Sequence, residues 1–431
     1  MRIQELYNLF KMNPIISIDS RTPGNGGIFF ALKGDRFNGN QFAEAAIDNG
    51  CSLAVIDDAK FARDDRFLFV DDSLACLQNL AAHHRDQFNI PVIGITGTNG
   101  KTTTKELISK VLKEKYSVVS TMGNLNNQIG VPLTLLAMKD DTQIAVVEMG
   151  ANHLGEIADL CHIAKPTHGL ITNIGIAHLE GFGSKENIRK AKSELYDYLE
   201  DHEGIIFYND RDETLTRLVD TRSTSKIPYC NGELHVKKEL QGGKEFYLTI
   251  QIGFEGKEYT LNTKLAGTYN LDNVMAALQL GVYFNVAMDS IIQAVESYYP
   301  ENNRSQFIKT RYNQVLLDAY NANPTSMNLA IDNFIASHGK DGMFILGDML
   351  ELGTTSDSEH KKLISKLHAI GSLDVVLVGE IFCKVATEKD FRTFKTVDEL
   401  FVWMRKNPVK SRDVFIKGSR RIALEKVVDL L

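Results

Sequence analysis

The sequence has few cysteines, and their placement excludes several kinds of site. The chain has five cysteines among 431 residues, an odd number, and none of them forms a Cys-x-x-Cys pattern. This arrangement argues against a disulfide framework and against a zinc site built from cysteines, and it favours a reducing compartment. The five are Cys51, Cys76, Cys161, Cys230 and Cys383.

Long apolar runs and an excess of positive charge are also absent. No stretch reaches the roughly 18 uninterrupted apolar residues that a membrane-spanning helix needs. The first residues carry Arg2, Glu5 and Lys11 and lack the apolar centre of a signal peptide. The formal net charge of −7 argues against a nucleic acid-binding surface over the whole protein. We therefore expect a cytoplasmic protein with no membrane span and no nucleic acid partner, although a local phosphate site remains possible.

The length of the chain and its changes in texture predict an α/β protein of three domains. Residues 1–85 hold short apolar runs between polar loops and predict a small α/β domain. Residues 86–301 alternate strands with helices and include turn-punctuated segments at 228–265 that predict antiparallel hairpins. Residues 302–431 resume the alternation, which favours a parallel sheet with helices on both faces. In this last region we expect strands at 315–318, 343–346, 375–378 and 414–417.

The strongest local signal is a phosphate-binding loop between a strand and a helix. The segment reads Thr96-Gly97-Thr98-Asn99-Gly100-Lys101-Thr102-Thr103, in which glycines let backbone N–H groups approach an anion closely. Lys101 is expected to reach the β- and γ-phosphates, and the Thr102 hydroxyl is expected to bind Mg²⁺. The standard pattern has a glycine where this chain has Ile95, so the loop is a contracted form. The alternative is a tight strand–helix turn without a ligand.

Three further residues are candidates for the metal site, with unequal local support. Glu148 directly follows an apolar strand and precedes Gly150, where an acidic side chain can hold the metal beside a nucleotide. His178 and Lys192 are weak candidates from spacing alone, because a single histidine is usually structural and a helical lysine usually faces water.

A second polar cluster follows a strand in the carboxy-terminal region. It reads Asp318-Ala319-Tyr320-Asn321-Ala322-Asn323-Pro324, and in open parallel sheets ligands bind beyond the carboxyl ends of strands. Asparagine and proline are also common in turns and helix caps, so local evidence leaves both readings open. The Asn-Lys-x-Asp motif of guanine-specific GTPases is absent, and three domains exceed the usual size of a small-molecule kinase.

Taken in order, these motifs resemble the Mur ligases of peptidoglycan synthesis. Each motif is modestly specific, but the ordered set covers nearly the whole chain and is highly specific. The resemblance is greatest to members that add D-alanyl-D-alanine to UDP-N-acetylmuramoyl-tripeptide. The matching segments are 96–105, 123–132, 147–153, 173–184, 318–324, 346–353 and 417–420.

The resemblance implies a role for each domain. The first would bind uridine, the central P-loop domain would bind ATP, and the third, Rossmann-like domain would close over both. For the UDP-sugar peptide it implies Ser20, Arg21 and Lys33 at the uridine end and Asn126 and Asn127 at the peptide. For ATP it implies Gly97, Thr98, Asn99, Gly100, Lys101, Thr102, Thr103, Asn270, Asn273, Arg304 and Asp318.

The resemblance also implies a metal site and a place for the second substrate. Two Mg²⁺ ions would be held by Thr102, Glu148, His178 and a carbamylated Lys192, whose added carboxylate can sit beside a cation. Lys101, Lys192 and His178 would be the catalytic residues. Asn321 and Asn323 would lie near the incoming dipeptide.

The expected reaction is amide formation through an acyl phosphate made from ATP, carried out by a monomer. The nearest alternatives are a ligase that adds the third amino acid of the peptide and a polyglutamate-adding ligase. An Asp-Asp-Tyr-Ala-His-like run would favour the former, and the uridine-type first domain argues against the latter. From another class, a nucleotide-switched scaffold could keep the loop and dispense with His178 and Lys192. Because the expected ATP contacts are split between 97–192 and 304–318, we expect the third domain to move.

Overall fold

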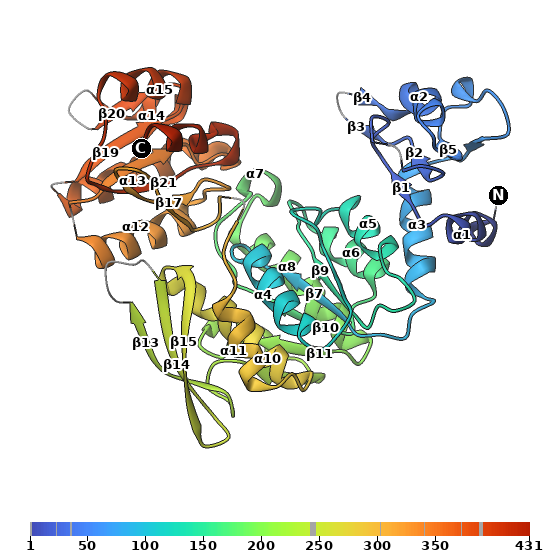
Figure 1. The fold of residues 1–431 in the computed structure, drawn as a ribbon, viewed down its shortest axis with the longest axis horizontal. Coiled ribbons are helices and arrows are strands. Elements are labelled where there is room, and N and C mark those ends of the chain that lie inside the picture. Colours follow the sequence, from blue (N-terminus) through green and yellow to red (C-terminus); the bar gives the residue numbers. More distant parts are fainter. Residues whose placement is uncertain are drawn as a thin grey trace.

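The chain forms three α/β units in sequence order, each built around its own mainly parallel sheet (Figure 1). The computed structural model describes residues 2–22, 24–34, 37–241, 247–301, 303–339, 341–371, 373–387 and 391–431. Asp35 and Arg36, part of the uridine-type pattern, lie outside these residues. The predicted α/β class is confirmed. Within the described ranges, no helix is long and apolar enough to cross a membrane.

The amino-terminal unit is a four-stranded parallel sheet covered on both faces. Its strands, in spatial order, are β1 (Ile16–Ser17), β2 (Ile28–Phe30), β5 (Leu53–Ile56) and β6 (Phe67–Phe69). Its helices are α1 (Ile3–Met12), α2 (Ala43–Asp48) and α3 (Ser73–Arg85), and β3 (Lys33–Gly34) pairs with β4 (Phe37–Asn38). Leu77 and Leu80 of α3 are fully buried in a core that continues into the central unit. This continuity fixes the amino-terminal unit to its neighbour.

The central unit places the phosphate loop at the middle of a six-stranded parallel sheet. The strands lie in the order β12 (Ser225–Pro228), β11 (Ile205–Tyr208), β10 (His168–Ile171), β7 (Val92–Thr96), β9 (Ile144–Glu148) and β8 (Val118–Ser120). From β7 the chain passes to β8 on one side, and from β9 it crosses to β10 on the other. The carboxyl end of β7 is therefore a topological switch point, where open sheets bind ligands.

Helices cover both faces of this sheet. One apolar cluster contains α4 (Lys101–Lys113), α10 (Leu271–Tyr283) and α11 (Met288–Glu296). The opposite cluster contains α5 (Gly130–Leu136), α6 (Glu156–Ala164) and α8 (Lys185–Asp201), with α9 (Glu213–Asp220) at its margin and the short α7 (Leu179–Phe182).

The predicted hairpins form a separate antiparallel sheet attached to the central unit. Its strands are β13 (His235–Gln241), β14 (Tyr247–Phe254) and β15 (Lys257–Ala266). Glu255 and Gly256 both have positive φ, 49° and 74°, at the turn between β14 and β15, as a two-residue hairpin turn requires. Gly242 and Gly243, which also predicted a turn, lie outside the described residues.

The carboxy-terminal unit is a doubly wound sheet of six strands. In spatial order these are β16 (Gln306–Lys309), β17 (Gln314–Asp318), β21 (Asp413–Lys417), β18 (Met343–Gly347), β19 (Asp374–Val378) and β20 (Arg392–Phe394). Only β16 pairs antiparallel among them. The main helices are α12 (Pro324–His338), α13 (Ser356–Ile370), α14 (Glu380–Val385) and α15 (Val397–Lys406), and apolar clusters fill both faces. The four strands predicted here all form.

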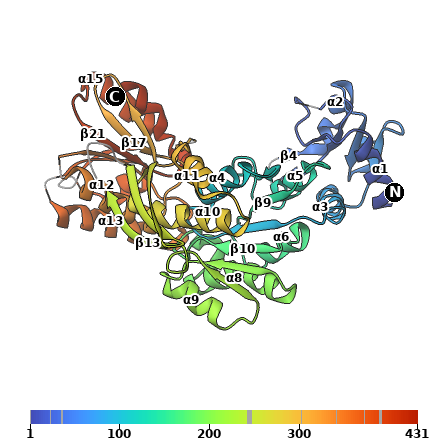
Figure 2. The same cartoon turned by 60° about the horizontal axis from the view of Figure 1, so that its bottom comes forward.

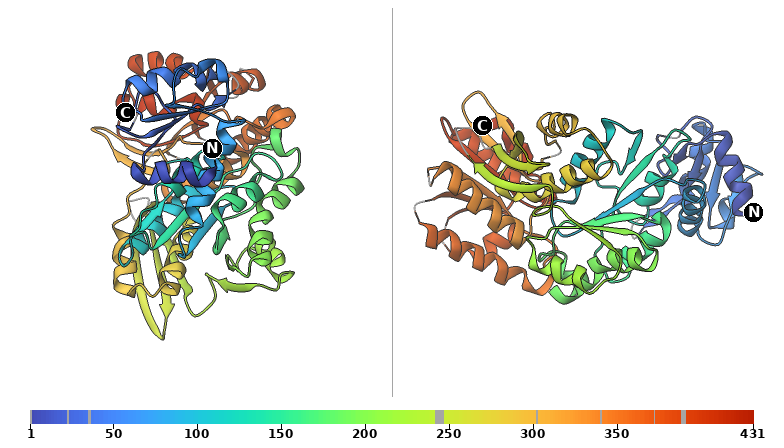
Figure 3. Two further views of the ribbon diagram at one scale, coloured as in Figure 1. Left: turned by 90° about the vertical axis from the view of Figure 1, so that its right-hand side faces the viewer. Right: turned by 90° about the horizontal axis from the view of Figure 1, so that it is seen from below.

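The outer units lie on opposite sides of the central one. Figure 2 shows the amino-terminal unit at one end and the carboxy-terminal unit at the other. The view from below in Figure 3 shows the carboxy-terminal unit beside the central sheet and its hairpins. A hydrogen bond from Asn323 to Asn99 shows that the carboxy-terminal unit contacts the side of the central unit that carries the phosphate loop.

Replacing Leu80 by alanine is expected to destabilise the amino-terminal and central units together. The cavity left in their shared core should cost about 3 kcal/mol of unfolding free energy. The midpoint urea concentration of unfolding, followed by circular dichroism, should therefore be lower than in the wild type. The fluorescence transition of Trp403, the single tryptophan, reports the carboxy-terminal unit and should stay in place.

Val402→Ala on the exposed face of α15 is the control, because its side chain is 56% exposed and should change stability by no more than about 0.5 kcal/mol. A Leu80→Ala protein that unfolds at the wild-type urea concentration would contradict the shared core.

Candidate functional site

The phosphate loop has the backbone geometry that an anion cradle needs. Gly97 and Gly100 have φ values of +139° and +81°, which side-chain-bearing residues rarely adopt. A Cβ atom at Gly97 would lie 2.0 Å from Thr172 Oγ1 and 2.9 Å from the Thr172 backbone nitrogen. Asn173 stabilises the loop, because its side-chain oxygen accepts a hydrogen bond from the Asn99 N–H (3.0 Å). The helix α4 then begins at Lys101, with its first N–H groups unpaired within the helix.

Lys101 lies over this loop. Its ammonium donates to the carbonyl oxygens of Gly97 (2.7 Å) and Thr98 (3.2 Å). Burial and the nearby Arg304 lower the pKa of Lys101, and the Glu148 carboxylate opposes them. The ammonium thus lies in a confined site, where it is held by carbonyls of the same loop that the sequence assigns to phosphate.

Glu148 is a buried carboxylate with one oxygen unused among the described residues. Its Oε1 accepts hydrogen bonds from Asn126 Nδ2 (2.7 Å) and Thr102 Oγ1 (3.2 Å). Its Oε2 is buried and has no bonded partner in the described part of the chain. A buried oxygen without a donor is costly, and a carboxylate beside a threonine hydroxyl is a donor set suited to Mg²⁺.

A preformed metal cage is absent from the described ranges, which hold no cluster of three or more His, Cys, Asp and Glu side chains suited to a metal. Mg²⁺ usually takes one or two protein carboxylates and draws other ligands from phosphates and water. The Thr102–Glu148 pair agrees with that kind of site.

Asn270 and Asn273, predicted near the adenine, lie at the start of α10 against the phosphate loop. Asn273 Nδ2 donates to Asn270 Oδ1 (2.9 Å), and Thr104 of α4 donates to Asn273 Oδ1 (3.0 Å). A Cβ atom at Gly100 would lie 2.5 Å from Asn273 Oδ1. Helix α10 is therefore packed directly on the loop.

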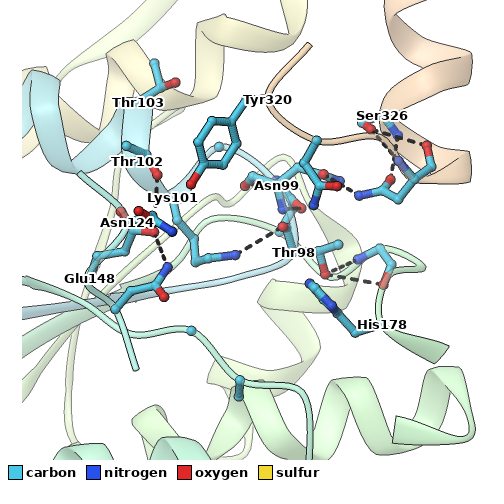
Figure 4. Close-up of a pocket in the computed structure, with 18 of the residues that line it drawn as sticks. Thr98, Asn99, Lys101, Thr102, Thr103, Asn124, Glu148, His178, Tyr320 and Ser326 are labelled. Atoms are coloured by element: carbon cyan, nitrogen blue, oxygen red, sulfur yellow. Dashed lines mark hydrogen bonds between the residues drawn. The ribbon is translucent and has the colours of Figure 1, made fainter. Parts of the chain in front are cut away.

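The carboxy-terminal unit contributes Arg304 and Asp318 to the same place. Asp318 is paired with the buried Lys417 and accepts a hydrogen bond from the Ser305 N–H (3.2 Å). The Arg304 guanidinium stacks on the Tyr320 ring at 3.5 Å from its centroid. Figure 4 shows Tyr320 among the residues that line the cavity, together with Lys101 and Thr102 of the phosphate loop. Charged groups of two domains thus face one cavity.

Asn321 and Asn323 differ in their surroundings. Asn323 caps α12 and also donates from Nδ2 to Asn99 Oδ1 (2.8 Å), across the seam between the two domains. Asn321 accepts a hydrogen bond from the Ala322 N–H and lines the cavity. The cluster is therefore both a helix cap and part of the cavity wall, and its contact with the dipeptide stays a prediction.

His178 has a partner that the sequence did not predict. It pairs through Nδ1 with Glu351 of the carboxy-terminal unit, and both residues have positive φ, 51° and 63°. Glu351 belongs to the segment 346–353 that carried part of the resemblance, but sequence alone gave it no role. The pair connects the central and carboxy-terminal units at the cavity.

Lys192 lies in α8 beside the cavity and is 3% exposed. Its ammonium has one long hydrogen bond, to the Ala151 carbonyl (3.5 Å), and lies 5.4 Å from the centroid of the Phe182 ring. Burial and the charge of Lys101 lower its pKa to about 7, against the opposing effect of Glu156 and Glu194. A sizeable fraction of the amine is therefore neutral near neutral pH.

Ser20, Arg21 and Lys33 lie apart from this cavity, in the amino-terminal unit. They follow the parallel strands β1 and β2, so they share the carboxyl edge of that sheet. Lys33 pairs with Asp57 (2.9 Å), whose Oδ1 also accepts a hydrogen bond from the buried Asn40 (2.7 Å). Arg21 pairs with Asp19 and is exposed. Their assignment to uridine stays a prediction.

A single cavity of about 1230 Å³ collects most of the predicted residues between the central and carboxy-terminal units. Those that line it include Thr98, Asn99, Gly100, Lys101, Thr102, Thr103, Asn126, Asn127, Glu148, His178, Asn270, Asn273, Arg304, Asp318, Asn321 and Asn323. This volume accommodates a nucleotide together with part of another substrate.

Comparison with known proteins agrees with this geometry. Three family models match in order: the Mur ligase family catalytic domain (residues 14–93), the Mur ligase middle domain (95–281) and the Mur ligase glutamate ligase domain (303–420). The UDP-N-acetylmuramoyl-tripeptide–D-alanyl-D-alanine ligase of Bacillus subtilis is 34% identical over 96% of this chain and 92% of its own length.

The chain belongs to the Mur ligase family.

Two solved MurF structures share nearly the whole fold of this chain. A crystal structure of MurF from Acinetobacter baumannii is 31% identical and superposes with a TM-score of 0.84, covering 96% of this chain and 92% of that one. MurF of Thermotoga maritima in complex with ADP is 27% identical and also gives a TM-score of 0.84, with 96% of each chain covered.

Four residues at or beside the site were not predicted individually from the sequence. Asn173, Tyr320, Glu351 and Lys417 each stand inside a segment that carried the family resemblance. Because their partners are distant in sequence, only the segment, and not the partner, could have singled them out.

Replacing Gly97 by alanine is expected to abolish nucleotide binding by this Mur ligase. Its φ is unfavourable for alanine, and the new Cβ would collide with Thr172, so the loop must deform. Calorimetric titration with ADP should show affinity reduced by at least about 100-fold, as expected when several phosphate contacts are lost.

Gly183→Ala is the matched control, because Gly183 also has a positive φ (74°) but has open space around its Cβ position. It should lose about 1 kcal/mol of stability and bind ADP normally. Equal ADP affinity in the two variants would contradict the assigned loop.

Proposed function

We propose that this protein is the ATP-dependent ligase that joins D-alanyl-D-alanine to UDP-N-acetylmuramoyl-tripeptide in peptidoglycan precursor synthesis. The observation that carries the proposal is the meeting, in one cavity, of the phosphate loop, Glu148 and the Asp318–Asn323 cluster. Relatives of that name match nearly the full length of the chain. Cytoplasmic location and a monomeric state are part of the proposal, and the five unpaired cysteines support a reducing compartment.

The chemistry overcomes the inertness of a carboxylate toward an amine. A carboxylate oxygen of the tripeptide attacks the γ-phosphorus of ATP, the bond to the bridging oxygen breaks, and ADP leaves. The amine of the dipeptide then attacks the carbonyl carbon of the acyl phosphate. The tetrahedral species loses inorganic phosphate and, to a base still unassigned, the proton of the amine.

The residues of this chain would act mainly by positioning and by neutralising charge. Lys101 and the first N–H groups of α4 would bind the phosphate oxygens, where negative charge shifts during transfer. Arg304 and Asp318 would hold the nucleotide from the other domain, and Asn270 and Asn273 would border its base.

Thr102 and Glu148 would hold one Mg²⁺, and this is supported by Oε2 of Glu148, which has no hydrogen-bond partner among the described residues. His178 and Lys192 would hold a second. When bound, the metal supplies positive charge that screens the phosphates from the attacking carboxylate. The chain contributes the oxygen ligands and the confined site.

Lys192 would serve as a ligand only after carbamylation by CO₂, which replaces an ammonium with a carboxylate. The neutral amine attacks the carbon of CO₂, a C–N bond forms, and one proton is released. A buried amine with a pKa near neutrality and one weak hydrogen bond fits this reaction.

The carboxy-terminal cluster favours the dipeptide over a single amino acid as second substrate. A ligase that adds the third residue is expected to show an Asp-Asp-Tyr-Ala-His-like run, whereas this chain has Asp318-Ala319-Tyr320-Asn321-Ala322. The amides of Asn321 and Asn323 can donate to and accept from a peptide group.

The proposal predicts phosphate release that depends on both substrates. Purified protein with ATP, Mg²⁺ and the UDP-muramoyl-tripeptide should release stoichiometric phosphate only when D-alanyl-D-alanine is added. Mass spectrometry should then show the mass of one dipeptide, less water, added to the nucleotide sugar. Removing Mg²⁺ with EDTA should stop the release.

Phosphate release that requires a different amine would agree with the ligase chemistry and would refute D-alanyl-D-alanine as the second substrate. Intact ATP binding without release for any pair would favour a nucleotide-switched scaffold.

Lys192→Ala is expected to lower turnover by at least about 1000-fold, by analogy with the loss of a charged group in phosphoryl transfer. In ¹³C NMR with labelled bicarbonate, the wild type should show a carbamate signal that the variant lacks. Lys190→Ala, an exposed lysine on the same helix, is the control and should keep both activity and signal. A carbamate signal that survives in Lys192→Ala would refute this assignment.

A further inference from the structure

Lys105 is a buried lysine to which the proposed chemistry gives no role. It lies one helical turn after Lys101 in α4 and is 3% exposed. Its ammonium donates to the Thr121 carbonyl (2.8 Å) and, more weakly, to the Gly123 carbonyl (3.5 Å). The nearest carboxylate, Glu106, is 3.6 Å away and accepts a hydrogen bond from Tyr298. The ammonium is therefore directed mainly at backbone carbonyls.

Those carbonyls belong to residues 121–128 in the connection between β8 and α5, which we call the substrate loop. Its polar residues Asn124, Asn126, Asn127 and Gln128 line the cavity. The loop also reaches the carboxylate of Glu148 through Asn126, and the Asn126 carbonyl accepts a hydrogen bond from the Gly150 N–H (2.7 Å). Its shape thus affects both the cavity wall and the proposed metal ligand.

Apolar packing holds the near end of this loop poorly. Met122 is 76% exposed and Leu125 is 40% exposed. Gly123 has a positive φ of 53°, and a Cβ placed there would meet no atom within 4 Å. Polar contacts are therefore the main restraint on residues 121–125.

A charged side chain at the buried position 105 carries a cost in free energy that a neutral one would avoid. A buried ammonium loses its hydration, and a neutral side chain of similar length would fill the same space without that cost. The short hydrogen bond to the loop carbonyl of Thr121 offsets this cost, together with the longer ion pair to Glu106, because hydrogen bonds from charged donors are stronger than neutral ones. Lys105 is also on the helix whose first turn forms the phosphate site, so it connects that site with the loop.

We propose that Lys105 is a positioning residue that fixes the substrate loop against the phosphate-loop helix and so prepares the binding surface for the muramoyl-peptide. The assignment of the substrate rests on the proposed function. The effect on the loop does not, since it follows from the contacts of Lys105 alone.

Lys105→Met tests this, with Lys110→Met as the matched control. Lys110 is on the same helix and also donates to a carbonyl, that of Ser297 (2.9 Å), but on the outer side away from the cavity. Lys105→Met should raise the KM for the UDP-muramoyl-tripeptide about tenfold or more, the change expected when a charged hydrogen bond is lost. Its ADP affinity should change less than about threefold, and Lys110→Met should match the wild type in both.

Hydrogen exchange of the unliganded protein separates this proposal from the proposed function. Amides of the substrate loop should exchange faster in Lys105→Met than in Lys110→Met, whatever substrate the enzyme uses. If Lys105→Met is insoluble, Lys105→Gln should show the same change to a smaller degree, because its uncharged amide can still donate N–H hydrogen bonds to the loop carbonyls.

Equal loop exchange in the two lysine variants would overturn the proposal. So would a parallel fall of ADP and tripeptide affinity, which would make Lys105 a general structural residue.

Discussion

The buried carboxylate of Glu148 is the group around which the central site is organised. One oxygen takes hydrogen bonds from Thr102 of the phosphate-loop helix and from Asn126 of the substrate loop, and the other has no donor in the described chain. A carboxylate buried in this way is stable only when its charge is compensated. Lys101 compensates part of it, and a bound cation would compensate the rest. The same group therefore links the three sites that we propose for phosphate, metal and peptide.

The two outer units contact the central one through different kinds of interaction. The amino-terminal unit shares an apolar core through α3, which resists relative motion. Across the other seam the contacts are mainly polar, such as Asn99 with Asn323 and His178 with Glu351, although Ala266 and Tyr269 pack into the carboxy-terminal core. Polar interfaces exchange protein partners for water at little cost, so relative motion is the default there. This supports the expectation that the third domain opens and closes.

The sequence was sufficient where structure depends on neighbouring residues. The phosphate loop, the strands of the carboxy-terminal sheet and the turn at Glu255 follow from glycine placement and apolar periodicity, which are local. Pairings across domains are not local. Asn99 and Asn323 are 224 positions apart, and nothing in the sequence around either residue indicates that the other is its partner. Glu351 likewise became visible as a partner of His178 only after folding had brought two loops together.

Three lysines near the cavity show why residue type alone underdetermines chemistry. Lys101 is bonded to carbonyls of the loop assigned to phosphate, so a phosphate can replace those acceptors. Lys105 is bonded to carbonyls that no proposed ligand replaces, and it is therefore suited to holding structure. Lys192 has a long hydrogen bond to a single carbonyl among the described residues, and burial together with the charge of Lys101 lowers the pKa of its amine to about 7. The role that we propose for each lysine is to bind phosphate, to hold a loop in place or to react with CO₂. That role depends on the hydrogen-bond acceptors that the fold places around the ammonium rather than on the sequence motif around the lysine.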